Sequence, residues 1–364
     1  MVRTGAAALA TLAALLVFGA VSAAGATVTP VMTGLDNPRG LAFGPDGALY
    51  VTEGGRGGPG PPFRVVRGET QGFGATGAIS RLRDGVQEKW LTGLPSLARP
   101  SGAEAEGGPQ DIAFAFRTIP FFGRNDAYVT IGLGGTPPTS RVPLGPAGTL
   151  MGKLIKVSAA RQITEIADIA AYEEAVNPAG GPIDSNPYGL LALSRQQIVA
   201  DAGANAVFSV AGGAVETLAV FPGRPNPTPI GPPFIDSVPT ATAVGPDGAL
   251  YVSELTGVPF LTGFARIHRI APNGSTSVYA TGLTTVVDLA FGDDGALYAL
   301  QHASCGPFFT CPGSIVQVAA SAPHPVVYGG LSRPAGMTIG RDDAFYVSNR
   351  GASAAVGEVL RIAP

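Results

Sequence analysis

A pattern of two short apolar runs separated by a polar turn recurs along this chain. Short apolar runs around a Pro-Asp-Gly or Asp-Asp-Gly turn predict tight β-hairpins. The tyrosines in the second runs of three copies, Tyr251, Tyr298 and Tyr346, lie 47 and 48 residues apart. That period is typical of propeller blades rather than of short solenoid repeats. The clearest copies are "FGPDGALYVTE" at 43–53, "VGPDGALYVSE" at 244–254, "FGDDGALYALQ" from Phe291 and "IGRDDAFYVSN" from Ile339.

Two further copies have a different turn: "PQDIAFAF" with "DAYVTI", and "PYGLLAL" with "QIVAD". The hairpins are followed by further alternating runs, such as "ARIHRI" from Ala265 and "STSVYATG" from Ser275 after the hairpin at 244–254. Alternation of apolar and polar residues is expected of half-buried antiparallel strands. The sequence therefore predicts an all-β fold, a six-bladed β-propeller of four-stranded antiparallel blades.

The last repeat lacks its outermost strand, because the sequence ends with "EVLRIAP" at Pro364. The segment "TVTPVMTGL" at 27–35 precedes the first innermost strand, and its ending matches "EKWLTGL" and "SVYATGL", which are outermost strands of other repeats. We expect this N-terminal strand to complete the last blade. Closure of that kind shields the sheet edges of an open ring.

Composition agrees with a turn-rich β fold. The chain has 52 Gly and 33 Pro, and only 13% of its residues are charged, against about a quarter in an average protein. Because the repeat continues to the last residues, we expect one domain over 27–364, and a monomer. A net charge of −3 offers no basic surface for nucleic acid, so we expect no such partner.

The first 26 residues have the pattern of a secretory signal peptide: one Arg, an apolar run from Ala6, and an A-x-A arrangement at Ala24 and Ala26. An uncleaved membrane anchor is the alternative, since the run approaches spanning length, but its Ala-rich hydrophobicity is weak. We therefore expect a secreted protein, extracellular or in the cell envelope, with no stable membrane insertion after cleavage.

Export also bears on the two cysteines. Cys305 and Cys311 enclose "GPFFT", and an even number of cysteines in an oxidising compartment predicts a disulfide. Two free buried thiols are the alternative.

The long Gly- and Pro-rich segments follow second strands or precede first strands, which places them on one face of a propeller. They include "EGGRGGPGPPFRVVRGETQGFGATG" at 53–77 and "PGRPNPTPIGPPFIDSV" before the fourth blade. Loops on a rigid scaffold usually carry binding function. We therefore place the candidate site on this face.

Polar side chains recur at the strand ends of that face, and seven of them are expected to ring one mouth. Second strands end at Glu53, Asp201, Glu254, Gln301 and Asn349, and innermost strands begin near Asp111 and Asp288. Arg39, Gln110 and Tyr188 stand at the strand starts and would shape the pocket, and His302 follows the polar ring.

Three interpretations of this ring stay open. It could bind a divalent cation such as calcium, with Glu53, Asp201, Glu254 and Asp288 as possible ligands, or a polyhydroxy ligand. Alternatively, the side chains cap neighbouring loops. The sequence has no G-x-S-x-G, H-E-x-x-H or phosphate-loop motif, so no catalytic residue is assigned.

Three long segments resemble the ScyD/ScyE family of secreted bacterial proteins, and the likeness covers nearly the whole mature chain. They are "GLDNPRGLAFGPDGALYVTEGGRGG", "DIAAYEEAVNPAGGPIDSNPYGLLAL" and "VADAGANAVFSVAGGAVETLAVFP". The part "VADAGANAVFSV" is also similar to the broader NHL repeat. The resemblance implies an exported six-bladed propeller and no particular activity. "CGPFFTC" is not part of it.

Two main functions follow from these observations. The first is a secreted binding or scaffold propeller whose long-loop face binds a small molecule or an extracellular protein or carbohydrate. The second is a metal-dependent hydrolase similar to the gluconolactonase propellers. A structural repeat protein of the cell envelope is a weaker third. Whether the chain is an enzyme stays open.

Overall fold

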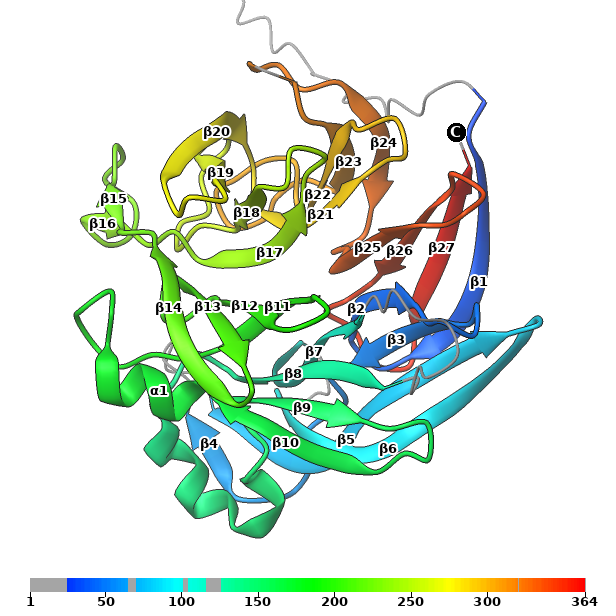
Figure 1. Ribbon diagram of the computed structural model, residues 1–364, viewed down its shortest axis with the longest axis vertical. Coiled ribbons are helices and arrows are strands. Elements are labelled where there is room, and N and C mark those ends of the chain that lie inside the picture. Colours follow the sequence, from blue (N-terminus) through cyan, green and yellow to red (C-terminus); the bar gives the residue numbers. More distant parts are fainter. Residues whose placement is uncertain (1–24, 65–69, 101–103, 116–125, 320, 364) are drawn as a thin grey trace, which may run out of the picture.

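Antiparallel meanders of strands are arranged side by side around a central axis, as in a β-propeller (Figure 1). The computed structural model describes residues 25–64, 70–100, 104–115, 126–319 and 321–363. Neighbouring strands along the chain pair with one another within each sheet, as expected of the predicted blades. The predicted β-propeller is thus confirmed as a fold class.

Four of the sheets are separate and have four strands each. The first two are β11 (Pro187–Ala192), β12 (Gln197–Asp201), β13 (Ala206–Ala211) and β14 (Ala214–Val220); and β17 (Pro239–Val244), β18 (Leu250–Glu254), β19 (Ala265–Ile270) and β20 (Thr276–Leu283). The other two are β21 (Val286–Phe291), β22 (Leu297–Gln301), β23 (Gly313–Gln317) and β24 (Val326–Leu331); and β25 (Gly336–Ile339), β26 (Phe345–Asn349), β27 (Gly357–Ala363) and β1 (Thr27–Leu35).

A nine-stranded sheet occupies the rest of the ring. It contains two meanders joined by only two residue pairs between β6 and β7. Its strands are β2 (Pro38–Phe43), β3 (Leu49–Glu53), β5 (Thr70–Arg83) and β6 (Val86–Ala98); β7 (Ala105–Phe114), β8 (Ala127–Leu133), β9 (Lys153–Val157) and β10 (Ile163–Asp168); and β4 (Pro62–Arg64), which pairs with β5.

The segment at 53–77, which we expected to be a loop, is partly strand. β5 begins at Thr70, and β4 pairs with it from Pro62↔Gly72 to Arg64↔Thr70. The long pairing of β5 with β6 continues to Gly72↔Ala98, so backbone hydrogen bonds extend this meander beyond the predicted strand ends. The remaining elements are the short strands β15 (Arg224–Pro225) and β16 (Phe234–Ile235), the 3₁₀ helices η1 (Pro138–Leu144) and η2 (Pro146–Gly148), and the helix α1 (Ile169–Val176).

The recurring "PDGALY" segment forms a hairpin turn with its own hydrogen bonds. Asp46 accepts hydrogen bonds from the Ala48 backbone N–H at 3.2 Å and from the Tyr50 hydroxyl at 3.1 Å. Gly47 has a φ of 79°, a left-handed conformation that glycine adopts without steric cost. The hydroxyl contact recurs in two other hairpins, between Tyr251 and Asp247 and between Tyr346 and Asp342. The repeated Asp and Tyr therefore maintain the geometry of the turn.

The core consists of apolar clusters that each lie between two successive meanders. The tyrosine of the hairpin contributes to several of them. Tyr50 contacts Phe114 on β7 with ring centroids 5.0 Å apart, and Tyr251 contacts Phe291 on β21 at 5.1 Å. Aromatic pairs of this kind add about 0.5–1.5 kcal/mol to the free energy of area burial. One residue thus closes its turn and packs against the next sheet.

The predicted closing strand is present: β1 pairs antiparallel with β27 from Thr27↔Ala363 to Leu35↔Gly357. Figure 1 shows this N-terminal strand in blue beside the C-terminal strand in red. Met32 and Leu35 on β1 are 1% and 0% exposed. The first and last described segments of the chain are thus held in one sheet.

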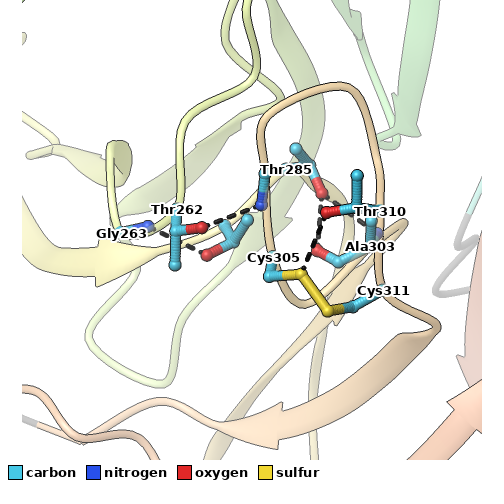
Figure 2. The surroundings of a disulfide bond; sticks show 9 residues. Thr262, Gly263, Thr285, Ala303, Cys305, Thr310 and Cys311 are labelled. Atoms are coloured by element: carbon cyan, nitrogen blue, oxygen red, sulfur yellow. Dashed lines mark hydrogen bonds between the residues drawn. A yellow bond between two sulfur atoms is a disulfide. The ribbon is translucent and has the colours of Figure 1, made fainter. Parts of the chain in front are cut away.

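The predicted signal peptide covers 1–26, and residues 1–24 lie outside the described residues. Within the described ranges, no helix is both long and apolar enough to cross a membrane. The predicted disulfide between Cys305 and Cys311 is confirmed (Figure 2).

Candidate functional site

The innermost strands begin with a common pattern: a Pro or Val, then a variable residue, then a small residue or Asp. In the described structure, variable residues from five of these strand starts line one cavity of about 110 Å³, which we call the mouth cavity. They are Arg39, Gln110, Tyr188, Thr240 and Val287. The sequence predicted the first three. Thr240 and Val287 were missed, although they occupy the same position of the repeat and alignment of the strand starts could have identified them.

The other residues around the mouth cavity come from loops and neighbouring strand ends. His302, predicted at the mouth, is among them. The full set is Glu104, Ala105, Glu106, Asn186, Ala202, Val238, Leu255, His302 and Phe309. A larger cavity of about 280 Å³ shares Glu106, Asn186, Ala202 and Val238 with it. The larger cavity is also lined by Asp184, Asn205, Phe234 and Asp236, so the two cavities adjoin.

Arg39 and Gln110, which line the mouth cavity, each have one buried polar atom without a hydrogen-bond partner. Arg39 is 9% exposed and Gln110 is 1% exposed. Arg39 Nη2 donates to the Ala105 carbonyl, and Gln110 Nε2 donates to the Glu106 carbonyl at 3.2 Å. Arg39 Nε and Gln110 Oε1 are buried with no hydrogen-bond partner in the described part of the chain. Unpaired polar atoms are costly to bury.

Two further polar groups of the cavity are neutral near pH 7. Burial lowers the pKa of His302 to about 4. Its Nδ1 lies 2.9 Å from the Pro334 carbonyl, and since a carbonyl only accepts, Nδ1 carries the proton and Nε2 is an acceptor. Burial also raises the pKa of Tyr188, while the nearby Arg39 opposes that rise. Arg39 is therefore the charged member of this group.

The disulfide loop holds Phe309 at one wall of the mouth cavity. The Gly306 N–H donates to Thr262 Oγ1 at 2.8 Å, the contact drawn beside the disulfide in Figure 2. The Phe309 ring stacks on Phe260 with centroids 4.1 Å apart, and the Arg333 guanidinium lies 4.9 Å from its centroid. These contacts and the Cys305–Cys311 bond fix an aromatic wall beside the polar groups.

Asp111 and Asp288 connect adjacent innermost strands within the ring. Asp111 accepts from the Leu190 N–H of β11 at 2.8 Å, and Asp288 accepts from the Met337 N–H of β25 at 2.7 Å. Both side chains are partly exposed. Burial raises the pKa of Asp288 to about 7, and burial together with the Asp288 charge raises the pKa of Asp111 well above its usual range. A Cβ at Gly40 would overlap Asp111, so that position requires glycine.

The polar residues at the second-strand ends line neither of these two cavities. Four of them accept from a backbone N–H in the loop that leads into their own sheet: Glu53 from Asp36 at 2.7 Å, Asp201 from Asn186 at 2.6 Å, Gln301 from Thr284 at 2.8 Å and Asn349 from Ser332 at 2.8 Å. Glu254 accepts instead from Arg224 at 2.6 Å and from the backbone N–H of Arg266 at 3.1 Å, and it lies 2.7 Å from His268 Nε2. Of the seven residues expected to ring the mouth, four thus cap loops, Glu254 is paired with Arg224 and His268, and Asp111 and Asp288 connect adjacent innermost strands.

The four candidate metal ligands do not fit one divalent-cation site. Glu53, Asp201, Glu254 and Asp288 lie on β3, β12, β18 and β21, in different parts of the ring. Their oxygens already make hydrogen bonds or ion pairs within the protein, such as Glu53 with Ser80 and Lys89. Across the described ranges, no three His, Cys, Asp or Glu side chains gather closely enough to hold a metal ion. These contacts correspond to the loop-capping interpretation.

Comparison with known proteins defines the class of fold. An iodide structure of the Trichoderma reesei Carbohydrate-Active Enzymes family AA12 protein is 11% identical, covers 97% of this chain and 100% of its own, and has a TM-score of 0.54. A glucose dehydrogenase has a TM-score of 0.53, and the soluble aldose sugar dehydrogenase of Escherichia coli, in the apo-form, has 0.52. Both are 14% identical and cover 93% of this chain and 99% of their own.

At such identities these likenesses show the β-propeller fold alone. The chain matches no protein-family model and no curated protein. The ScyD/ScyE resemblance therefore stays an expectation.

Proposed function

We propose that this chain is a binding propeller that holds a small polar ligand in the mouth cavity. The observation that carries the proposal is the convergence of five strand starts on one cavity, which brings Arg39, Gln110 and Tyr188 together with apolar side chains. A cavity with a few polar side chains among apolar ones is typical of small-molecule sites.

Binding is better supported than catalysis. His302 has a pKa of about 4, far below the value near 7 that suits a general base. The carboxylates that a metal-dependent hydrolase would use are engaged as loop caps, as Glu53 and Asp201 illustrate. Among the described residues, the hydrolase alternative thus has no arrangement of side chains to support it.

We also propose that the ring has six blades, with the nine-stranded sheet counted as two. The two residue pairs between β6 and β7, Leu97↔Gly107 and Ala98↔Ala105, support this division, as does the presence of an apolar cluster on each side of every meander. The sequence resemblance to the ScyD/ScyE family supports the same count.

Export is part of the proposal. The pattern of residues 1–26 supports a signal peptide, and the Cys305–Cys311 disulfide is of a kind that persists in oxidising compartments. Secretion would place the mouth cavity in contact with small molecules or extracellular proteins and carbohydrates.

The test is to measure ligand binding with and without the Arg39 head group. Small molecules released by denaturing the purified protein are identified by mass spectrometry, and their binding is measured by calorimetry. We expect Arg39→Met to weaken binding by about tenfold or more, the effect of removing a hydrogen bond to a charged group. Arg269→Met is the matched control, because Arg269 pairs with Asp247 at the hairpin end of its blade. Equal affinity in wild type and Arg39→Met would overturn the proposal.

A further inference from the structure

The larger cavity, of about 280 Å³, is lined by an aromatic side chain that stays largely accessible. Phe234 is 58% exposed, and covering such apolar surface with a ligand is favourable. The residue belongs to β16, which forms with β15 a short hairpin that projects at the edge of the ring in Figure 1. The cavity therefore offers a ligand an apolar ring face.

The hairpin holds this aromatic side chain in place. Pro225 on β15 pairs with Phe234 on β16. The Asn226 backbone N–H donates to the Pro233 carbonyl at 2.9 Å, and Asn226 Nδ2 donates to the Pro232 carbonyl at 2.8 Å. Because a group that is ordered before binding loses little entropy on binding, the ring is prepared for contact with a ligand.

Asn186 supplies an accessible hydrogen-bond donor to the same cavity. Its Oδ1 accepts from the Gly134 N–H at 3.1 Å, which fixes the orientation of the amide and leaves Nδ2 as the donor. Within the described ranges Nδ2 has no acceptor, and it is not one of the buried unpartnered atoms. A ligand can therefore reach this donor directly.

Asp236 supplies an accessible acceptor beside the aromatic ring. The residue is exposed, and its carboxyl group has no hydrogen-bond or ion-pair partner among the described residues. Ile235, between Phe234 and Asp236, is 0% exposed. Since successive side chains of an extended segment point to opposite sides, Phe234 and Asp236 share the side that lines the cavity.

We propose that the larger cavity is a second binding site, which takes a neutral sugar in its pyranose ring form. The inference goes beyond the proposed function, which concerns the mouth cavity. One sugar hydroxyl donates to the Asp236 carboxyl group, and another accepts from Asn186 Nδ2. The C–H face of the sugar ring packs on Phe234, whose ring face carries partial negative charge.

The size of the cavity agrees with such a ligand. Its volume of about 280 Å³ is nearly twice the roughly 150 Å³ that holds benzene in an engineered cavity. A six-membered ring that carries several hydroxyl groups therefore has room in it.

Other classes of small ligand match the lining less well. Three acidic residues line the cavity, namely Glu106, Asp184 and Asp236, and none of its described lining residues is Lys, Arg or His, which disfavours an anion. An ammonium ion without hydroxyl groups has no acceptor for Asn186 Nδ2. A hydrocarbon would cover both polar groups without giving them partners. A hydroxyl both donates and accepts, so a neutral polyol matches both groups.

Ligand-observed NMR titration tests this preference with probes of different charge. The neutral probes are glucose, galactose, xylose and maltose; gluconate is an anionic polyol, and tetramethylammonium is a cation without hydroxyl groups. We expect at least one neutral sugar to bind about tenfold or more tighter than gluconate and tetramethylammonium. Maltose that binds tighter than glucose would identify the end of a glycan as the natural ligand, and weaker binding a free sugar; both agree with the proposal.

Two variants locate the bound sugar. Phe234→Ala should weaken binding about fivefold, and Asp236→Ala about tenfold or more. Phe308→Ala and Asp293→Ala are the matched controls and should bind like the wild type, because both residues are exposed and neither lines the cavity. Thermal melting checks that each variant is folded; if one is not, Phe234→Leu or Asp236→Asn is measured in its place.

The outcomes separate this inference from the proposed function. If no neutral sugar binds, or if Phe234→Ala and Asp236→Ala bind like the wild type, the inference fails. If Arg39→Met abolishes sugar binding and Phe234→Ala does not, the sugar lies in the mouth cavity, which overturns the second site and supports the proposed function. Binding that depends on Phe234 and Asp236 but not on Arg39 supports the second site, whether or not the mouth cavity takes a ligand.

Discussion

Shortening the buried side chains of the closing strand should strongly destabilise the whole ring. Met32 and Leu35 on β1 are 1% and 0% exposed and pack in a cluster with Leu41, Leu49 and Val359. That cluster joins the last sheet to the first meander of the nine-stranded sheet. Replacing a buried Leu or Met by Ala typically costs about 2–5 kcal/mol. We therefore expect Met32→Ala and Leu35→Ala each to lower the free energy of unfolding by about that amount.

Deleting β1 altogether should have a larger effect. It removes the pairing from Thr27↔Ala363 to Leu35↔Gly357 and leaves β27 as an open sheet edge, which promotes association. Since natural domains have only about 5–15 kcal/mol of stability, the loss of both buried side chains would use up most of it. We expect the deletion variant to be aggregated or largely unfolded.

Urea unfolding followed by tryptophan fluorescence and circular dichroism measures these changes, with the denaturant dependence checked for constancy between variants. The matched control on the same strand is Val28→Ala, because Val28 is 36% exposed and should change stability by only about 0.5 kcal/mol. The reasoning would be refuted if Met32→Ala and Leu35→Ala cost no more than Val28→Ala. It would then follow that β1 lies against β27 without closing the ring.

Two further predictions concern the carboxyl group of Asp288 and the disulfide. Burial raises the pKa of Asp288 from 3.8 to about 7, so the folded state binds more protons than the unfolded state between about pH 4 and 7, and stability should fall as the pH rises through that window. Asp288→Asn should flatten the fall by on the order of 2 kcal/mol between pH 5 and 8; an unchanged slope in urea titrations would count against the buried carboxyl. Cys305 and Cys311 should resist alkylation until a reductant is added, and the intact mass should then rise by two hydrogen atoms. Labelling of both without reductant would contradict the disulfide.

The hairpins and the closing strand could be predicted because their signals are local. Asp46 and Tyr50 stand four residues apart and bond within one turn, so the same short pattern produces the same structure wherever it occurs. The match between the endings of β1 and of other outer strands reflects a shared position in the blade. The strand content of 53–77 was missed because its pairing with β6 extends beyond the repeat.

The direction of the polar residues at second-strand ends could not be predicted. A side chain at that position can point to the central axis or to the loop of its own sheet. Glu53 and Gln301 point to the loop, because the backbone N–H groups of Asp36 and Thr284 need acceptors there. The larger cavity could not be predicted either. Asp184 and Asp236 line it from separate loops, and no periodic pattern in the sequence connects them.

The two ends of each innermost strand differ in what the sequence keeps constant. At the hairpin end, the Asp and Tyr of the turn are repeated, and they close the turn and pack against the neighbouring sheet. At the mouth end, the flanking residues are restricted, as the glycine required at Gly40 shows, while the residue between them is Arg39, Gln110, Tyr188, Thr240 or Val287. A scaffold that needs the same backbone in every blade can vary only those side chains that point away from it. Residues at the variable position can therefore differ between blades without disturbing the ring, and Arg39 and Gln110, each with one unpartnered polar atom, stand there.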